Sequence, residues 1–216
     1  QAWTSLPNGV ADTTNSDDTI SAQFQPSLNG TYTIGGPGAH FTTFADAVNA
    51  MAIWGICGQV NFDVRPGFYS EQIAIPNITG ASPASPIISA SETGVASDVE
   101  LSFASQDFAN NYTVRFDGAS NVQFLNMTLS ATDFSYAHVF DFVGNCENIT
   151  VDNCEIYGIN PGYTSPELAL FHCDWGNGTI DGLNITNNIM IDGSYGAYFS
   201  GGQGSYFNTN ISGNYI

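Results

Sequence analysis

The sequence predicts an all-β chain folded as a parallel β-helix, in which successive turns of short strands stack on one another. Three observations predict this fold. A pattern of two hydrophobic residues five positions apart returns at intervals of 27, 34 and 26 residues. Hydrophobic and polar residues alternate with a period of two from Val60 onward, as in strands with one buried face. A repeat of this length that absorbs insertions is typical of stacked structural units. The hydrophobic pairs are Phe124 and Leu129, Val151 and Ile156, Ile185 and Met190, and Ile211 and Ile216.

Asn126, Asn153, Asn187 and Gly213 occupy the same position inside each pair. We expect them at equivalent corners of successive turns, with the asparagine side chains forming a structural ladder. A further strand precedes each pair, over residues 114–116, 139–142, 168–171 and 197–199. Each repeat thus contains three short strands, enough for one turn of a parallel β-helix whose inward residues stack on those of the next turn.

One helix is predicted, over about residues 41–55, before the long β region. Phe41, Phe44, Val48, Met51 and Ala52 fall on one face at helical spacing, and Thr42 or Thr43 can serve as N-cap. An amphipathic helix at this place can cover the open end of the stack.

The domain organisation that follows is an extended N-terminal arm over residues 1–29 and a capped β-helix over residues 30–216. The fourth repeat ends at Ile216, an inward position, without a polar turn, helix or proline to close the stack. An uncovered strand edge is a template for aggregation. We therefore expect the native polypeptide to continue; the less favoured alternative is a second subunit that covers the end.

The charge balance restricts the partners. Twenty acidic residues face two basic ones, Arg65 and Arg115, which gives a net charge of −18. This charge repels phosphate backbones and anionic lipids, so we expect no nucleic-acid partner. Membrane insertion is not expected either, because no apolar run approaches the ~20 residues that a spanning helix needs. The chain begins at Gln1, which fits a removed signal peptide, and an acidic, amide-rich surface suits an extracellular protein.

Four cysteines, Cys57, Cys146, Cys154 and Cys173, lack the paired spacing of a zinc site. The last three lie on neighbouring repeats. They could form a disulfide between turns or stay as buried free thiols, and the sequence does not decide between the two.

The segment "GTYTIGG…FTTFADAVNAM…GQVNFDVRPGFYSEQIAI" resembles the N-terminal part of right-handed parallel β-helix proteins with the pectin-lyase-like fold. Its nearest resemblance is to the large exported surface proteins of Bacteroidota. The resemblance covers roughly residues 30–216 and implies a right-handed β-helix. It implies no particular activity, because this scaffold hosts lyases, hydrolases, esterases and inert adhesin stalks alike.

The sequence lacks the catalytic sets that the resemblance implies. Pectate lyases use calcium with a basic residue, but lysine is absent and both arginines have structural explanations: Arg65 lies in a Pro-Gly turn and Arg115 points out of a strand. Pectin methylesterases need two aspartates, a glutamine pair and an arginine in set segments, and those segments were not recognised. We therefore expect no catalytic residues and no cofactor, so that the chain is not an enzyme.

Other residues allow a binding or metal role beside a structural one. His172, next to Cys173 and Asp174, could mark a metal site, but a lone histidine is more often a turn or core residue. Outer acids could share a structural Ca²⁺, although solvated carboxylates are the preferred interpretation; they are Asp141, Asp152, Asp174, Asp181 and Asp192. A ligand or partner surface is predicted at Tyr157, Tyr163, Tyr195 and Tyr198, on or near the insertion 158–168 and the segment 195–206.

The resulting hypothesis is a non-catalytic, structural or adhesive portion of a large cell-surface protein. It would assemble as a homo-oligomer or filament, with neighbouring subunits and cell-surface glycans as partners. The alternative is a secreted carbohydrate-active enzyme or polysaccharide-binding module of the pectin-lyase-like fold.

Overall fold

The computed structural model describes residues 2–3, 19–20, 26–174, 176, 178–201 and 206–216. Most of the predicted arm lies outside these residues. Its described parts are β1 (Ala2–Trp3) and β2 (Thr19–Ile20), which pair antiparallel. No described helix is long and apolar enough to cross a membrane.

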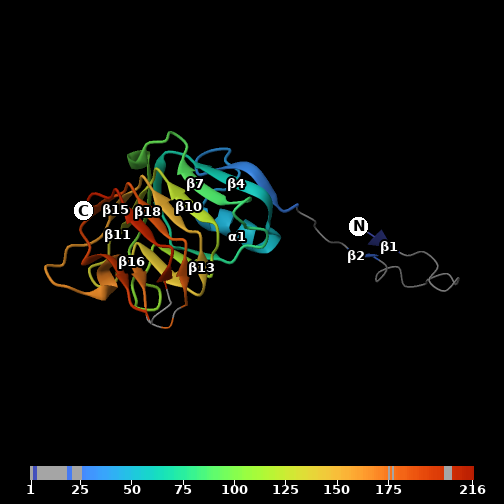
Figure 1. The fold of residues 1–216 in the computed structure, drawn as a ribbon. Helices are drawn as coiled ribbons and strands as arrows, with labels where there is room; N and C mark the ends of the chain where they lie inside the picture. The colour runs from blue at the N-terminus through green and yellow to red at the C-terminus, as the bar shows by residue number, and fades with distance from the viewer. Residues whose placement is uncertain (1, 4–18, 21–25, 175, 177, 202–205) are drawn as a thin grey trace.

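The described residues from 26 onward form a parallel β-solenoid of about six turns, of the right-handed type, as predicted (Figure 1). Its colour runs from one end of the stack to the other in Figure 1, which shows that chain order follows the stacking axis. Within the described residues, four parallel sheets form the walls.

The seven-stranded sheet has the order β22-β18-β14-β10-β7-β4-β3. Its strands are β3 (Leu28–Ile34), β4 (Ile56–Val64), β7 (Ile87–Ser91), β10 (Val122–Leu125), β14 (Thr150–Asp152), β18 (Asn184–Thr186) and β22 (Asn210–Ser212). A five-stranded sheet contains β5 (Gly67–Ser70), β8 (Val99–Phe103), β11 (Thr128–Ala131), β15 (Glu155–Tyr157) and β19 (Ile189–Ile191).

A second five-stranded sheet, called the site sheet below, has the order β20-β16-β12-β9-β6. Its strands are β6 (Ile73–Pro76), β9 (Val114–Asp117), β12 (Phe140–Val143), β16 (Ala169–Cys173) and β20 (Tyr195–Phe199). A three-stranded sheet that the repeat pattern did not predict contains β13 (Cys146–Glu147), β17 (Ile180–Asp181) and β21 (Tyr206–Phe207). Two-residue strands carry too little sequence for a periodicity to reveal them.

Two 3₁₀ turns, η2 (Ala96–Asp98) and η3 (Pro166–Leu168), lie between strands.

The predicted register is confirmed in the seven-stranded sheet. Val151 pairs with Phe124 on one side and with Ile185 on the other, and Ile185 pairs with Ile211. Val151 and Ile185 are fully buried, whereas Ile211, on the last turn, is 49% exposed. These residues therefore stack in one column inside the solenoid, and the column becomes exposed to solvent at Ile211.

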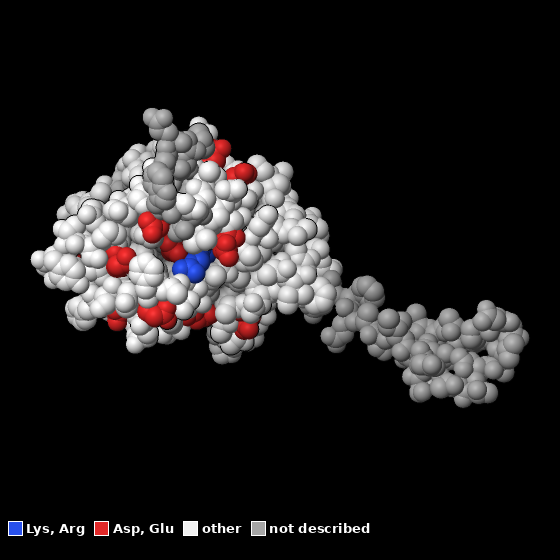
Figure 2. Space-filling model, turned by 90° about the horizontal axis from the view of Figure 1, so that it is seen from below, with Lys and Arg blue, Asp and Glu red and all other residues white. Residues whose placement is uncertain are grey.

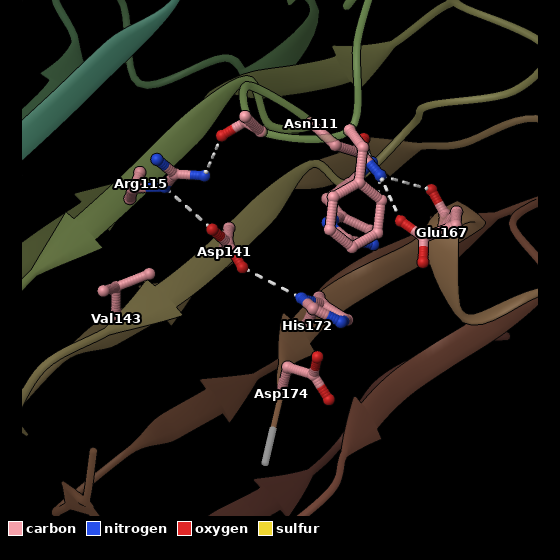
Figure 3. Close-up of a pocket in the computed structure, with 10 residues that line it drawn as sticks. Asn111, Arg115, Asp141, Val143, Glu167, His172 and Asp174 are labelled. Carbon is pink, nitrogen blue, oxygen red and sulfur yellow. Dashed lines mark hydrogen bonds and ion pairs between the residues drawn. The ribbon is translucent and has the colours of Figure 1, made fainter. Parts of the chain in front are cut away.

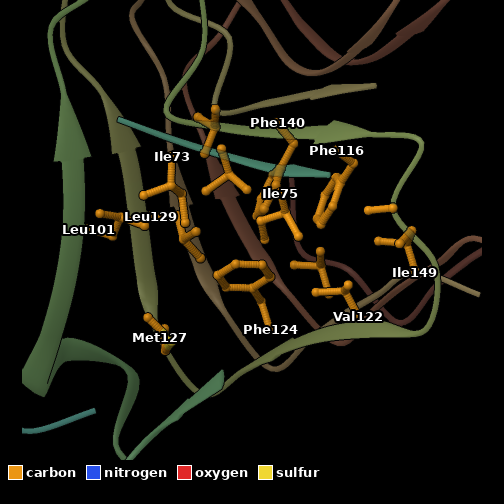
Figure 4. Packing of buried hydrophobic residues seen from close by; sticks show 14 of the residues in the cluster. Ile73, Ile75, Leu101, Phe116, Val122, Phe124, Met127, Leu129, Phe140 and Ile149 are labelled. Atoms are coloured by element: carbon orange, nitrogen blue, oxygen red, sulfur yellow. The ribbon is translucent and has the colours of Figure 1, made fainter. Parts of the chain in front are cut away.

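Stacked phenylalanines fill the interior beside this column (Figure 4). The ring of Phe140 lies 6.0 Å from that of Phe116 and 4.8 Å from that of Phe171, and both pairs are nearly parallel. Phe140 and Phe171 are register partners on adjacent turns, so the spacing of about 4.8 Å between turns brings these two rings face to face. Each buried ring contributes roughly 1.5–3 kcal/mol through the hydrophobic effect.

The predicted capping helix is present as α1 (Phe44–Trp54), shorter than expected at its start. Thr43 is its N-cap and accepts a hydrogen bond from the backbone N–H of Asp46. The buried face is formed by Phe44, Ala47, Val48 and Met51. Ala52, predicted on this face, is exposed, whereas Ala47 is buried. At about 3.6 residues per turn the buried face centres on Phe44 and Met51, so that Ala47 falls inside it and Ala52 at its edge.

The corner asparagines adopt the left-handed backbone conformation, with φ of 53° at Asn126, 52° at Asn153 and 55° at Asn187. Asn153 donates through Nδ2 to Asn126 Oδ1 at 2.6 Å, whereas Asn187 donates to Asp152 Oδ1 at 2.9 Å. Asparagine tolerates this conformation better than other residues with a Cβ. The sharp corner explains the residue type at these positions.

Candidate functional site

The site sheet presents a row of polar side chains on its outer face. Arg115 pairs in register with Asp141, Asp141 with His172, and His172 with Tyr198, each on the next turn. Their neighbours along the strands are buried, because successive strand residues point to opposite faces. Adjacent turns therefore bring together residues that lie 26 to 31 positions apart in the chain.

Asp141 is the centre of this row (Figure 3). Its Oδ2 accepts a hydrogen bond from Arg115 Nε at 2.8 Å, and its Oδ1 lies 2.9 Å from His172 Nδ1. Arg115 is held further by the carbonyl of Ala109, to which Nη2 donates at 3.0 Å, and by the ring of Tyr112 below its guanidinium. Both carboxylate oxygens thus have fixed partners.

These contacts set the protonation of Asp141, which is only 4% exposed. Burial raises the pKa of the carboxyl, but the hydrogen bond to His172 and the charge of Arg115 outweigh burial, so that the pKa lies below its usual value. Asp141 is therefore ionised at neutral pH. Because it can then only accept, His172 donates Nδ1–H to it and keeps the lone pair on Nε2.

A second histidine lies against the first. The rings of His138 and His172 are stacked, with centroids 3.8 Å apart and planes 13° from parallel. The backbone N–H of His138 donates to Asn111 Oδ1 at 3.0 Å, and His138 Nε2 lies 3.0 Å from the carbonyl oxygen of Pro166. Since a carbonyl can only accept, Nε2 carries the proton and Nδ1 carries the lone pair.

The Nδ1 atom of His138 is buried and has no hydrogen-bond partner among the described residues. Burial lowers the pKa of His138 to about 4, with the neighbouring His172 as the next cause. The imidazole is therefore neutral at pH 7. A buried nitrogen with an unused lone pair costs about 1–3 kcal/mol, so this atom is an exception to the usual pairing of buried polar groups.

A pocket of about 230 Å³ opens over this row. Its charged lining consists of Asp141, Glu167, Asp174 and Arg115, three carboxylates against one guanidinium. Phe108 stands at its rim and is 65% exposed. The face drawn in Figure 2 carries one basic patch surrounded by separate acidic side chains.

Asn111 fixes one wall of the pocket. It is 2% exposed and donates through Nδ2 to the carbonyl of Glu167 at 2.9 Å and to its Oε2 at 3.1 Å. Both amide protons are thereby used. Asn111 Nδ2 also lies 3.3 Å from His138 Nε2; with Nε2 protonated toward Pro166, this is a contact between two donors and not a hydrogen bond.

Three side chains of the site could hold a metal ion. His138, Asp141 and His172 each offer a donor atom, and the three atoms lie within 4.8 Å of one another. Two imidazoles and one carboxylate are ligands of catalytic Zn²⁺ sites and of non-haem iron sites.

Several sequence predictions need correction here. Asp141, for which the sequence favours a solvated carboxylate, is buried in an ion pair. Arg115 points outward as predicted, but it belongs to the site, whereas Arg65 binds the carbonyls of Gly35 and Pro37 near the capped end. His172 is not alone, because the topology brings His138 against it.

The predicted tyrosine surface is spread over two sheets. Tyr195 and Tyr198 lie on β20, and the ring of Tyr198 is parallel to that of His172 at 6.0 Å, so it extends the polar row. Tyr157 lies on β15 and donates to Glu155, and Tyr163 is exposed in the loop after it. Cys57, Cys146, Cys154 and Cys173 are free thiols, so the disulfide alternative is wrong.

Sequence reasoning missed His138, Asn111 and Glu167. A signal was present, because His138 and His172 stand 34 residues apart, one of the repeat intervals. The hydrophobic repeat, however, follows strands of other sheets. His138 lies two residues before β12, so the alternation of hydrophobic and polar residues within that strand does not include it.

Comparisons with known proteins concern the fold. No family model matches the chain, and no curated sequence does. Among solved structures, it is similar to the pectin methylesterase of Aspergillus niger in a penultimately deglycosylated form, with a TM-score of 0.46, 14% identity, and coverage of 89% of this chain and 78% of that one. The deglycosylated form of the same enzyme gives a TM-score of 0.36 at 14% identity, covering 88% and 89%. Escherichia coli YbhC gives 0.45 at 14% identity, covering 94% and 71%.

The prediction that the chain is not an enzyme is corrected by these findings, because the matching structures include enzymes. The prediction was wrong because it considered only the catalytic residues of known enzymes of this fold, such as pectate lyases and pectin methylesterases, in their order along the sequence. The described residues instead bring Arg115, Asp141 and two histidines together in a pocket that Glu167 and Asp174 also line.

Proposed function

We propose that the chain is a carbohydrate-active hydrolase that cleaves an ester on an uncharged polysaccharide. The observation that supports this proposal is the Asp141 carboxylate, bonded to both Arg115 and His172 on the floor of the pocket. The adhesin hypothesis has no comparable support, since none of the contacts described above relates to adhesion.

The chemistry follows from the arrangement of protons. His172 holds its Nδ1–H toward Asp141, so Nε2 can accept a proton from a water molecule. The water oxygen forms a bond to the carbonyl carbon of the ester, and the bond from that carbon to the alkoxy oxygen then breaks. The leaving alcohol takes the proton back from the imidazolium, and the products are an acid and an alcohol.

Asp141 and Arg115 support His172 without taking the proton. The carboxylate keeps the imidazole in the required tautomer and stabilises the imidazolium that forms. Arg115, bonded to Oδ2, keeps the pKa of Asp141 low, so the proton stays on His172. An ester is favoured over a glycosidic bond because glycosidases need a carboxylic acid that gives up its proton, and Asp141 is held ionised.

The charge and shape of the molecule favour a neutral polymer. A net charge of −18 repels polyanions, whereas esterified or unmodified sugars carry no charge. The row Arg115–Asp141–His172–Tyr198 crosses four turns, so a linear chain lying along the stack meets successive side chains about 4.8 Å apart.

Turnover is tested with methyl-esterified polygalacturonan and acetylated xylan, with de-esterified polygalacturonate as the charged comparison. We expect release of alcohol or acetate from the esters and loss of turnover in His172→Gln. The matched control is His40→Gln, because His40 bonds to Thr33 near the capped end of the stack. Equal turnover in His172→Gln and the wild type would exclude this mechanism.

A polysaccharide-binding module is the second candidate, favoured by the exposed ring of Phe108 at the rim. Sugars stack on exposed aromatic faces, so Phe108→Ala would weaken glycan binding even if nothing is cleaved. Secretion, glycan partners at a cell surface and assembly of copies through residues 1–29 remain predictions.

A further inference from the structure

We propose that His138, Asp141 and His172 form a binding site for one divalent transition-metal ion, with Zn²⁺ as the best fit. The site lies in the same pocket as the proposed hydrolysis. A catalytic role of the metal ion rests on that proposed function, whereas metal binding by these residues does not.

The first argument is the unused lone pair of His138. Nδ1 is buried and has no partner among the described residues, although His138 is held from two sides through its backbone N–H and Nε2. These contacts fix the imidazole in the tautomer that a metal ligand needs. Ligating histidines commonly donate their other N–H to a carbonyl, as Nε2 does here to Pro166.

The second argument is the convergence of donor atoms. Asp141 Oδ1 and His172 Nδ1 lie 2.9 Å apart, and the donors of all three residues lie within 4.8 Å. Ligands of a tetrahedral Zn²⁺ at about 2.0–2.1 Å are separated by about 3.3 Å. The donor atoms are therefore near the spacing that a zinc site needs. Because the two rings are only 13° from parallel, one of them has to turn out of the stack before the lone pairs converge.

The charge and ligand types select the ion. Three carboxylates against one guanidinium attract a cation into the pocket, which offsets the repulsion by Arg115. Ca²⁺ takes six to eight oxygen ligands, so a set with two imidazoles disfavours it, whereas Zn²⁺ accepts such a set and leaves a fourth position open.

Metal binding changes the role of the Asp141–His172 pair. His172 donates its Nδ1 proton to Asp141 across 2.9 Å, and an ion held by both atoms would displace that proton to solvent. A zinc ion held by these residues would supply a water that loses its proton near neutral pH, in place of the water activated by His172.

The test uses the full chain with Cys57→Ser, because Cys57 is an exposed thiol and thiolates are zinc ligands. Chelator-treated protein is titrated with ZnCl₂ in a calorimeter, and Co²⁺ is added separately to record its visible absorption. We expect one Zn²⁺ per chain and the intense visible band of four-coordinate Co²⁺. His138→Gln and His172→Gln should each weaken zinc binding by roughly 100-fold or more, while His40→Gln leaves it unchanged.

Two measurements keep the outcome decisive. Far-UV circular dichroism with chelator shows whether each variant is folded, and a zinc-dependent rise in the melting temperature of the Cys57→Ser chain reports binding without any histidine variant. No binding by the Cys57→Ser chain, or unchanged affinity in folded His138→Gln, overturns the site. Zinc binding without turnover overturns the proposed hydrolysis alone; turnover that resists chelators, without zinc binding, overturns the metal site alone.

Discussion

His172 Nδ1 and Asp141 Oδ1 lie 2.9 Å apart on adjacent turns, although 31 residues separate them in the chain. Their contact depends on the register of β12 with β16, where Asp141 pairs with His172. Moving that register by one residue would turn one of the two side chains into the core. The geometry of the site therefore depends on the register in which β12 and β16 stack.

Asp141→Asn should abolish most turnover and also destabilise the fold. The amide cannot hold His172 in the same tautomer, so we expect kcat/KM to fall by roughly 10³–10⁴-fold. Arg115 would lose its carboxylate partner, which costs about 3 kcal/mol when the pair is buried. Because the Arg115 side chain is 22% exposed, solvent screening reduces that cost.

Denaturant unfolding and ester turnover measure the two effects separately. Asp152→Asn is the matched control, since Asp152 accepts hydrogen bonds at a corner of the stack outside the pocket. A variant Asp141→Asn with full turnover would rule out the role assigned to this carboxylate.

The metal-free protein should lose stability on mild acidification because of His138. Its pKa is about 4 in the folded chain and about 6.5 when unfolded, so the unfolded state binds the proton more readily. The contribution is complete above pH 6.5 and is lost as the pH falls from 6.5 through 4, by about 3 kcal/mol in total.

The free energy of unfolding, measured with chelator from pH 7.5 to pH 4, checks this prediction. His138→Gln should flatten the dependence in this range, whereas His40→Gln should not. Below about pH 4, Asp141 adds a further loss. The low pKa of Asp141 means that its stabilisation is present above the unfolded pKa of about 3.9 and disappears as the folded pKa is passed.

Phe140→Ala should cost about 3–5 kcal/mol, because it opens a cavity between the stacked rings of Phe116 and Phe171. Phe134→Ala removes the same side chain from a position that is 72% exposed and should change stability by less than about 0.5 kcal/mol. Denaturant midpoints of the two variants give the comparison, and equal midpoints would contradict the phenylalanine stack as the core of the site sheet.

Only one thiol should react rapidly with a disulfide reagent in the native chain. Cys57 is exposed, whereas burial raises the pKa of Cys146 to about 11 and that of Cys154 to about 12. Since the thiolate is the reactive form, the buried thiols should react only on unfolding. Cys57→Ser should remove the fast phase, and a fast phase that survives this change would contradict the burial of the other thiols.

The repeat predicted much of the scaffold because its signal is local and recurrent. Hydrophobic residues recur at Phe124, Val151 and Ile185, and this recurrence alone predicts that they stack in one column inside the β-helix. The asparagine corners gave a second, independent sign, since few other residues tolerate the left-handed backbone there. The short strands β13, β17 and β21 carried no comparable signal.

The site could not be predicted in the same way. Arg115, Asp141 and His172 occupy outward positions, where polar residues are expected in any β-helix, so none of them departs from the pattern. His138 stands outside the strand and joins the others only because the turn before β12 folds against η3. Its unused Nδ1 is a property of surroundings built from three turns.

The sequence alone determined that the chain stacks in parallel turns. Hydrophobic residues recur at the inward positions of each turn, and each is buried only when the next turn stacks on it. Only the tertiary structure decided which outward residues meet. Neighbours across the turns are set by loop lengths and by register, and these join a carboxylate, a guanidinium and two imidazoles whose separate positions in the chain give no sign of their contact.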